Sequence, residues 1–403
     1  MISVGIDVSK GHSAVCMLKP GGEVVKSPFD MQHTIDEVTS LVNLIKSFDE
    51  EVRVVLETTG HYHWPVTAVL IKNDIFVCQV NSLRMKRFCS QSLRRAKTDK
   101  IDSIKIASYG IAYWDELERM IPVNDIYSEL RMLSRQYHFT VSLMIKAKVN
   151  LTTLLDKVMP GIKDIIADYN NGNKLCDFVT RYYHFDHIKK MGKRFESDYR
   201  KWAKKKGYRK YERQLEKILS LVQNGIPTLP DSTSTKIIVQ EAVRALREIQ
   251  ISRDIILAQM QDLAKTLPEY SLVREMNGIA EVLAPRLIAE IGDIRHFKSK
   301  HSLIAYAGID APTFQSGSFT GKNRHISKRG NKYLRKTGFE LMQCLLMHKF
   351  EGDPVYDFIQ KKRAEGKSSK VAMIAGMNKF LRVYYGKVTE LYNTIDSELD
   401  LAA

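Results

Sequence analysis

Residues 1–10 read MISVGIDVSK, and this stretch decides the fold class of the first domain. Its apolar, β-branched residues predict a strand over 2–8, and residues 13–18 can return beside it as a hairpin partner. Side chains alternate between the two faces of a strand, so Asp7 faces opposite to its apolar neighbours. The sequence therefore predicts an acid at the end of a buried strand.

The segments that follow alternate between strand and helix. Strands followed by strand–helix alternation predict a mixed sheet covered by helices, an α/β domain over residues 1–125. The expected elements are a helix over 35–45, a strand over 52–56 that ends at Glu57, a helix over 63–72, a strand over 75–80 and a helix over 100–109.

A different period begins near residue 130 and predicts a long helical middle region over 126–270. Apolar residues recur on alternating three- and four-residue steps, as in heptad seams. We expect two long helices that pair with each other or with a second subunit, although an ordinary bundle core would show the same pattern. The seams are Leu130, Leu133, Tyr137, Met144, Leu151, Leu154 and Val158, then Val239, Ala242, Leu246, Ile249, Ile256, Met260, Leu263 and Leu267.

The remainder, residues 271–395, is expected to be a mostly α-helical domain. A loop rich in Ser, Gly and Thr spans 312–321, and a basic helix is expected from about Asn331. The last ten residues are expected to be frayed.

The charge balance indicates a polyanionic partner. Lys and Arg exceed Asp and Glu enough to give a formal net charge of +16, and cations that neutralise phosphates release condensed counterions. Nucleic acid is favoured over a membrane surface. The cations cluster at Arg84, Lys86, Arg87, Arg94, Arg95 and Lys97, from Lys189 to Arg213 (including Lys204 and Lys205), and from Lys322 to Lys336.

Aromatic residues are interleaved in the second of these clusters. Tyr199, Trp202, Tyr208 and Tyr211 stand among the lysines and arginines. Rings beside cations suit stacking on unpaired bases as well as phosphate contact, so we expect both modes there.

Cysteine usage and hydropathy favour a cytoplasmic protein without a membrane partner. The five cysteines are scattered without a CxxC pair, which argues against a zinc site and a disulfide framework. No apolar run approaches the roughly 20 residues that span a bilayer, and the first residues lack the features of a signal peptide.

Four acids stand where metal chemistry would need them: Asp7, Glu57, Asp99 and Asp102. Acids at the ends of buried strands repel one another unless cations neutralise them, and hard divalent cations would also clamp a phosphodiester. Singly, each acid is as readily a turn or capping residue, and Asp99 could cap the helix that follows. Together, in a basic protein, they favour a metal site. His61 and His63 lie nearby and are better explained as a polar loop pair.

A second candidate site lies in the serine-rich loop. Ser316, in Gln315-Ser316-Gly317-Ser318, has a small neighbour that leaves room for in-line attack on a phosphodiester. Cations that could hold the phosphate follow at Lys322, Arg324, Lys328, Arg329 and Arg335. By chemistry alone, a flexible surface turn before a DNA-binding helix is the stronger explanation.

Six segments together resemble one protein family. Residues 5–10 (GIDVSK), 56–60 (LETTG) and 97–102 (KTDKID) resemble the DEDD, RuvC-like domain of the insertion-sequence one-ten family of transposases, which also includes Piv-type DNA invertases. Residues 305–308 (AYAG), 315–317 (QSG) and 326–331 (ISKRGN) resemble the C-terminal transposase domain of that family. Their order, spacing and total length match across nearly the whole chain.

The resemblance implies an RNase H-like (RuvC-like) first domain and a guide-RNA-dependent DNA recombinase. Asp7, Glu57, Asp99 and Asp102 would bind Mg²⁺ (or Mn²⁺), and Ser316 would form a covalent phosphoserine link to DNA. An alignment slip of two residues would assign that role to Ser318 instead. The implied partners are donor and target DNA, a guide (bridge) RNA, and further copies in a homodimer or homotetramer. The implied place is the nucleoid of a bacterium or archaeon.

Four alternatives stay open on the sequence. One is a metal-only RuvC-like junction nuclease in which Ser316 is a loop residue, and another is a DNA invertase that needs no guide RNA. A sugar kinase-like or actin-like ATPase also opens with a Gly-Ile-Asp strand, but it needs glycine-rich phosphate loops that the first hairpin lacks. A non-catalytic nucleic-acid binder would leave the four acids without a role.

Overall fold

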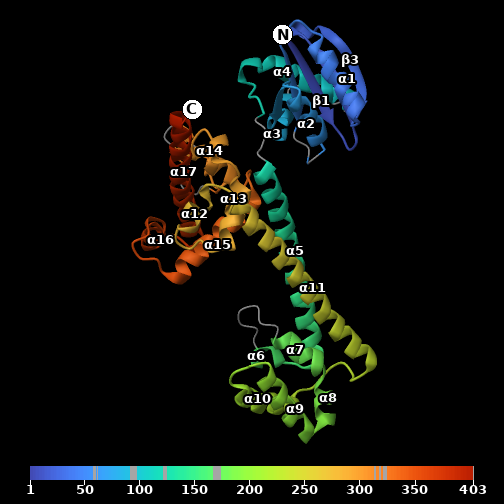
Figure 1. Cartoon of the computed structure of the whole chain (residues 1–403), viewed down its shortest axis with the longest axis vertical. Helices are drawn as coiled ribbons and strands as arrows, with labels where there is room; N and C mark the ends of the chain where they lie inside the picture. Colours follow the sequence, from blue (N-terminus) through green and yellow to red (C-terminus); the bar gives the residue numbers. More distant parts are fainter. Residues whose placement is uncertain are drawn as a thin grey trace. The chain divides into compact units, whose positions relative to one another are not determined.

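The computed structural model describes residues 1–57, 60, 62–90, 98–120, 125–166, 174–312, 315–316, 319–320 and 325–402. The chain divides into two compact units, Met1–Val123 and Asn124–Ala403, and each is described by itself (Figure 1).

The first unit is built on a five-stranded mixed sheet in the order β3-β2-β1-β4-β5. Three strands form an antiparallel meander: β1 (Ile2–Val8), β2 (His12–Leu18) and β3 (Val24–Gln32). Two more run parallel to β1: β4 (Val52–Glu57) and β5 (Phe76–Val80). The predicted α/β class is confirmed, and this order is that of RNase H-like domains. The sequence does not predict β3, because it is a largely exposed edge strand that tolerates Pro28.

Helices cover both faces of the sheet. The apolar side chains of β1, such as Ile2, Val4 and Ile6, pack with α1 (Ile35–Lys46) and α2 (Trp64–Lys72). The opposite face packs with α3 (Ser82–Cys89) and α4 (Asp99–Ala112). The unit is thus a three-layer arrangement with the sheet in the middle.

Helix α4 lies unusually close to the sheet because a glycine of β1 faces the helix and a glycine of α4 faces the sheet. A Cβ on Gly5 of β1 would stand 2.3 Å from the backbone nitrogen of Ala107 and 2.3 Å from the carbonyl oxygen of Ser103. A Cβ on Gly110 of α4 would stand 2.1 Å from the Oγ of Ser3. No larger residue fits at either point, so backbone meets backbone and the helix is held flush on the strand.

The second unit contains the two long helices that the heptad-like seams predict. Helices α5 (Asp125–Val158) and α11 (Thr233–Ala264) pack along each other as a hairpin within one chain. The Ser232 side chain accepts a hydrogen bond from the Thr235 amide and so caps the start of α11. At 1.5 Å per residue, α5 is about 50 Å long.

Each end of the hairpin belongs to a different hydrophobic core. One core, which we call the tip domain, combines the end of α5 and the start of α11 with five shorter helices. These are α6 (Ile162–Ile165), α7 (Lys174–Arg181), α8 (Phe185–Met191), α9 (Lys193–Lys205) and α10 (Tyr211–Asn224).

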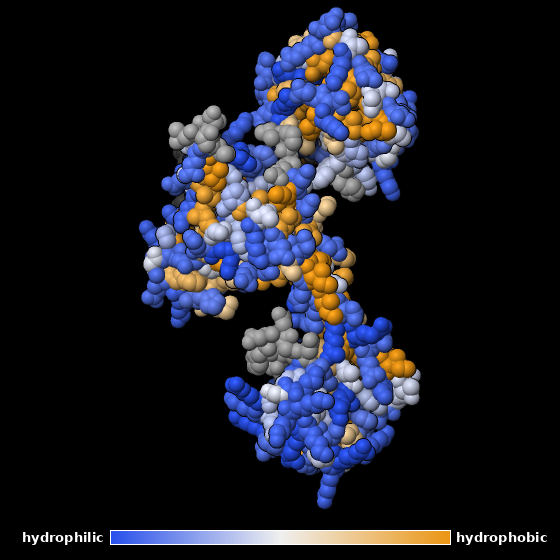
Figure 2. Space-filling model, viewed as in Figure 1, coloured by the Kyte–Doolittle hydropathy of each residue, from blue (hydrophilic) through white to orange (hydrophobic). Residues whose placement is uncertain are grey.

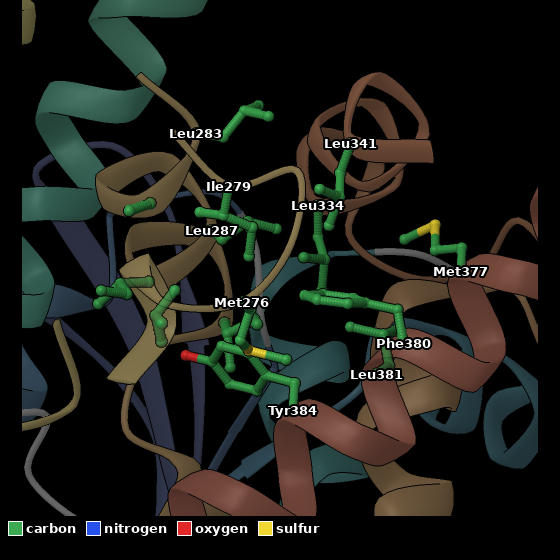
Figure 3. Close-up of a cluster of buried hydrophobic side chains, with 14 of the residues drawn as sticks. Met276, Ile279, Leu283, Leu287, Leu334, Leu341, Met377, Phe380, Leu381 and Tyr384 are labelled. Atoms are coloured by element: carbon green, nitrogen blue, oxygen red, sulfur yellow. The ribbon is translucent and has the colours of Figure 1, made fainter. Parts of the chain in front are cut away.

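The other core joins the opposite end of the hairpin to the C-terminal helices (Figure 3). Buried Glu269 accepts hydrogen bonds from the hydroxyls of Tyr127 and Tyr392, both at 2.6 Å, and so ties α5 and α12 to α17. The elements are α12 (Glu269–Arg274), α13 (Leu283–Ile291), α14 (Lys300–Ala307), β6 (Gln315–Ser316), β7 (Phe319–Thr320), α15 (Lys332–His348), α16 (Pro354–Ala364) and α17 (Ser369–Ala402). Short 3₁₀ turns occupy Pro20–Gly22, Trp114–Glu116 and Ile294–His296.

Two expectations are wrong in this unit. The end of the chain is not frayed, because α17 continues to Ala402 and its inner face is buried through Tyr392. The aromatics among the tip cations do not form a stacking surface. Tyr199 is fully buried, and the half-buried rings of Trp202 and Tyr208 pack into the tip core. Aromatic rings bury more apolar area than any other side chains, so the core of this small helical domain incorporates them.

Among the helices of the described residues, none has the length and apolar character needed to cross a bilayer.

Candidate active site

Asp7 and Glu57 lie at corresponding positions near the ends of the neighbouring parallel strands β1 and β4. Ile6 pairs with Leu56 in the β1–β4 ladder, so Asp7 and Glu57 are the next residues of the two strands at the same edge. Strand alternation places Asp7 on the face of Gly5, and Glu57 on the face of Val55. Since α4 covers that face, both acids lie on the α4 side of the sheet.

The direction of α4 brings its first turn to the same edge. Gly110, near the end of the helix, meets Ser3, whereas Ser103, near its start, meets Gly5. The helix is therefore antiparallel to β1, and Asp7 lies toward the residues that precede Ser103. Asp99 and Asp102 occupy that first turn, with Thr98 rather than Asp99 as the capping residue. The structure thus brings all four predicted acids to one edge of the sheet.

Each α4 acid has a cationic or ionisable neighbour. Asp102, which is half-buried, accepts a hydrogen bond at 3.0 Å from the Nζ of Lys105. Asp99 is exposed, and its Oδ2 lies 3.9 Å from the Nε2 of His12 on β2. Neither partner is predicted from the sequence, although the spacing of three residues between Asp102 and Lys105 on a helix is typical of an ion pair.

Cys89, at the end of α3, lies near the acids at this edge of the sheet. Burial raises the pKa of its thiol, the carboxylates of Asp102 and Glu57 raise it further, and Lys105 opposes them. The carboxylates of Glu57 and Asp102 thus both lie close enough to this thiol to act on its charge.

The donor set suits a hard divalent cation, but the acids are not arranged as a finished metal site. Carboxylate oxygens are the ligands that Mg²⁺ and Mn²⁺ prefer. Within the described residues, however, no three His, Cys, Asp or Glu side chains are positioned to hold an ion together. Lys105 occupies one carboxylate, so a metal ion would have to displace this ammonium group.

Several predicted neighbours of the acids cannot be described. Arg94, Arg95, Lys97 and His61 lie outside the described residues. His63 is buried, with its Nε2 2.7 Å from the Nε2 of Gln79, which agrees with leaving it out of the acid cluster.

In the second unit, the end of α14 with Gly308 and the loop 326–331 pack directly against each other, and we call them the interlocked loops. A Cβ on Gly330 would stand 2.0 Å from the carbonyl oxygen of Tyr306, and a Cβ on Gly308 would stand 2.5 Å from the amide nitrogen of Gly330. The Lys328 amide donates to the Gly308 carbonyl at 3.0 Å. The two glycines therefore allow one backbone to run against the other.

Asn331 and Glu290 anchor these loops to the core. The Asn331 side chain caps α15, and its Nδ2 donates to the fully buried Glu290 carboxylate at 2.8 Å. Ser134 and Arg135 of α5 donate to the same carboxylate at 2.7 and 2.9 Å. A buried carboxylate needs several donors, and here they come from α5 and the loop, so Glu290 fixes the loop on the hairpin.

The cations of this region separate into two kinds. Lys328 and Arg329 are exposed beside the interlocked loops. Arg335 is half-buried, and its Nη1 donates to the carbonyls of Ala307 and Gly330 at 2.9 and 3.0 Å. Lys322, Arg324 and Ser318 lie outside the described residues, and Ser316 is described by its place in β6.

His138 of α5 is a buried imidazole among cations. It is 5 % exposed, its ring centroid lies 4.9 Å from that of Tyr333, and within the described structure neither ring nitrogen has a hydrogen-bond partner. Burial, followed by the nearby charges of Arg286, Lys336 and Arg135, lowers the pKa of His138 to about 3. The folded chain therefore holds this ring neutral.

Comparison with protein families identifies both regions. A model for the DEDD domain of IS110 elements, described as a transposase, matches residues 4–160. A second model, described as the transposase IS116/IS110/IS902 family, matches residues 270–356.

Individual proteins are similar as well. An uncharacterized 44.8 kDa protein of insertion element IS116 from Streptomyces clavuligerus is 24% identical over 369 residues, which cover 91% of this chain and 89% of that protein. The pilin gene-inverting protein of Moraxella bovis is 31% identical over 137 residues, which cover 33% of this chain and 42% of that protein. Among solved structures, RuvC of Thermus thermophilus aligns over 30% of this chain and 100% of its own, with 11% identity and a TM-score of 0.25.

The state of His138 makes the stability of the protein sensitive to acid. The folded pKa is depressed below the usual value near 6.5, so the stabilisation is complete above pH 6.5 and is lost as the pH falls toward 3. Between pH 6.5 and 5.0 the loss should reach about 2 kcal/mol, since one pKa unit corresponds to about 1.4 kcal/mol. We expect His138→Phe to remove this component from the pH dependence of urea unfolding.

The matched control is His301→Phe, at an exposed position, which should keep the acid sensitivity of the unaltered chain. An equal acid sensitivity in the His138→Phe protein would contradict the assignment.

Proposed function

Because this chain belongs to the IS110 family of transposases, we propose that it cuts and rejoins DNA with two separate groups of residues. The first group is the acid cluster of the RNase H-like unit, Asp7, Glu57, Asp99 and Asp102. The second is the serine of the C-terminal unit, Ser316. The observation that carries the proposal is that strand register and the direction of α4 bring the four acids to one sheet edge.

The acid cluster would hold one or two Mg²⁺ or Mn²⁺ ions. Such an ion, when bound, stabilises negative charge on phosphate oxygens and orients the attacking and leaving groups. Asp7 and Glu57 come from the rigid sheet, so they are held in place by the ladder. Asp102 would exchange the Lys105 ammonium for the ion, and the released Lys105 could then contact a DNA phosphate.

Ser316 would act as the nucleophile on the scissile phosphodiester. Its hydroxyl loses a proton as the bond from Oγ to phosphorus forms, the bond from phosphorus to the leaving sugar oxygen breaks, and that oxygen takes up a proton. The phosphoserine bond conserves the energy of the phosphodiester, so attack by another sugar hydroxyl can rejoin DNA without a further energy source. Lys328 and Arg329, exposed beside the loops, would bind non-bridging phosphate oxygens.

A guide RNA is the finer part of this proposal. It rests on the family resemblance and on a net charge of +16, which exceeds what a single DNA contact strip needs. The RNA would pair with donor and target DNA and so specify the sites, while the protein supplies the chemistry.

A homodimer or homotetramer would be the working form at the nucleoid. The middle of the hairpin exposes apolar side chains on both helices, including Phe139 and Val149 of α5 and Ile255 of α11, which are 54%, 60% and 64% exposed. A second copy could cover them. Light scattering of the purified protein tests this part: a mass of a single chain would contradict it.

One alternative has its own observation. The pilin gene-inverting protein matches the chain over 137 residues, so an invertase that recognises its sites without RNA is the second candidate.

The acid cluster predicts a metal-dependent loss on substitution. Asp7→Asn should lower DNA cleavage in Mg²⁺ on the order of 10³-fold, because it removes one charged ligand worth several kcal/mol in the transition state. The matched control is Asp36→Asn, at an exposed acid of α1, which should cleave normally. Cleavage that continues in the presence of a chelator would refute the metal role.

The serine predicts a covalent adduct. With labelled DNA, the unaltered chain should give a protein–DNA band on a denaturing gel, and Ser316→Ala should give none. Ser318→Ala, the neighbouring control, should keep the band. A reversed pattern would assign the attack to Ser318, and cleavage that survives both substitutions would indicate a metal-only nuclease.

The guide proposal predicts that one discrete RNA copurifies with the protein when the flanking DNA is co-expressed. Sequencing of the bound RNA is the measurement. Random cellular fragments, or no RNA, would favour the protein-specified invertase.

A further inference from the structure

The tip domain lies between the two regions that match family models, 4–160 and 270–356. It has its own core, in which Phe178, Phe195 and Tyr199 are fully buried. Its helix α9 is rich in lysine and arginine, whereas α10 carries Arg213 and Lys217 together with Glu212 and Glu216, and Figure 2 shows a mostly hydrophilic surface over this lobe.

The cations of α9 share one face of the helix. At 100° per residue, they fall within a sector of about 120°, and the buried Phe195 and Tyr199 and the half-buried Trp202 lie on the opposite side. The face is formed by Lys193, Arg194, Ser197, Lys201, Lys204 and Lys205, all exposed. It extends about 18 Å along the helix axis.

The remaining cations of the domain are used differently. Arg181 pairs with Asp198 at 2.6 Å, Arg200 with Glu212 at 3.0 Å, and Lys206 with Asp177 at 2.8 Å, so these pairs connect the tip helices to one another. In contrast, within the described residues, no ion pair involves the cations of the α9 face. The domain places its acids where they hold helices together and leaves this face uncompensated.

The basic surface continues past the turn into α10. Arg209, Lys210, Arg213 and Lys217 are exposed, and they too have no ion pair in the described structure. Lys210, Arg213 and Lys217 lie on one side of α10, at spacings of three and four residues. The turn Lys206–Lys210 connects the helix that carries the first cationic face to the helix that carries the second.

The buried rings decide which nucleic acid this surface fits. Proteins that hold single strands stack bases on exposed aromatic rings, whereas here Tyr199 is fully buried, and Trp202, Tyr208 and Tyr211 are partly buried against the tip core. The α9 face offers four lysines, one arginine and one serine, and it lacks the Asn and Gln side chains that read adenine by paired hydrogen bonds. Lysines as point charges suit phosphates, and duplex DNA carries one charge per 1.7 Å of axis.

We infer that the tip domain is a DNA clamp that holds the phosphate backbone of duplex DNA, without reading its sequence, through the cationic faces of α9 and α10. This inference rests on the proposed function in that the duplex is the DNA on which the chain acts. The hairpin of about 50 Å would let the clamp hold the duplex away from the C-terminal loops.

The test measures salt-dependent binding of the full chain to a 30-base-pair DNA duplex of arbitrary sequence, with an RNA duplex and a dT single strand of the same length beside it. The variant is Lys201→Ala/Lys204→Ala/Lys205→Ala, at exposed helix positions where alanine preserves folding. The matched control is Lys361→Ala/Lys367→Ala/Lys370→Ala, which removes the same charge from exposed positions at the α16–α17 turn.

We expect the tip variant to lower the slope of log K against log salt by about 2.7, or about 0.9 for each lost phosphate contact. Affinity near 0.15 M salt should fall on the order of 10- to 100-fold, and the control should keep the slope and affinity of the unaltered chain. An unchanged slope overturns the inference, and so does an equal loss in the control. Tighter binding of the RNA duplex or the single strand, lost in the tip variant, also overturns it.

Binding and cleavage report on different proposals. An unaltered chain that binds in this way but never cuts DNA would refute the proposed function and leave the clamp in place. If the chain cuts DNA, but the tip variant keeps the slope of log K against log salt of the unaltered chain, only the clamp is refuted.

Discussion

The contact between α4 and β1 is the constraint on which the first unit depends. Because Gly5 and Gly110 have no side chains, the helix lies directly on the strand, and its direction and register are fixed by backbone contact. Flexible side chains between them would leave the helix free to slide by part of a turn. A slide of that size would move the first turn of α4 away from Asp7 and Glu57. The glycines thus position acids that lie two residues away along β1 or about two to three turns away along α4.

In the second unit, charged side chains with partners differ in position from those without. Glu290 is fully buried and collects donors from α5 and from the loop before α15, which makes it a structural anchor. Much of the segment 326–331 serves the same purpose, since Gly330 and Asn331 connect one loop to another. Among the described residues, the cations without an ion pair include Lys328 and Arg329 beside the loop and the cations of the α9 face. Such uncompensated charge disfavours a compact fold through self-repulsion, so its presence in clusters indicates a polyanion that neutralises it.

The hairpin separates these tasks in space. One end of α5 is buried with the C-terminal helices and the other with the tip helices, so a single pair of helices carries two cores. Between them, the two helices have no third layer, and several of their apolar residues stay exposed. Two-helix packing can bury one stripe per helix, and a heptad seam with extra apolar positions leaves the excess to a further partner.

The sequence by itself determined the α/β class of the first unit and the two long helices of the second, because strand alternation and helix period are local properties. The edge strand β3 was not predicted from the sequence, because an exposed strand lacks the alternation of apolar and polar residues that identifies a strand. Only the tertiary structure decided that Asp7, Glu57, Asp99 and Asp102 share one edge, since this depends on strand register and helix direction. It also decided that Tyr199 and its neighbours form a core. A ring between two lysines in the sequence can face solvent or the interior, and only the packing of helices against one another buries it.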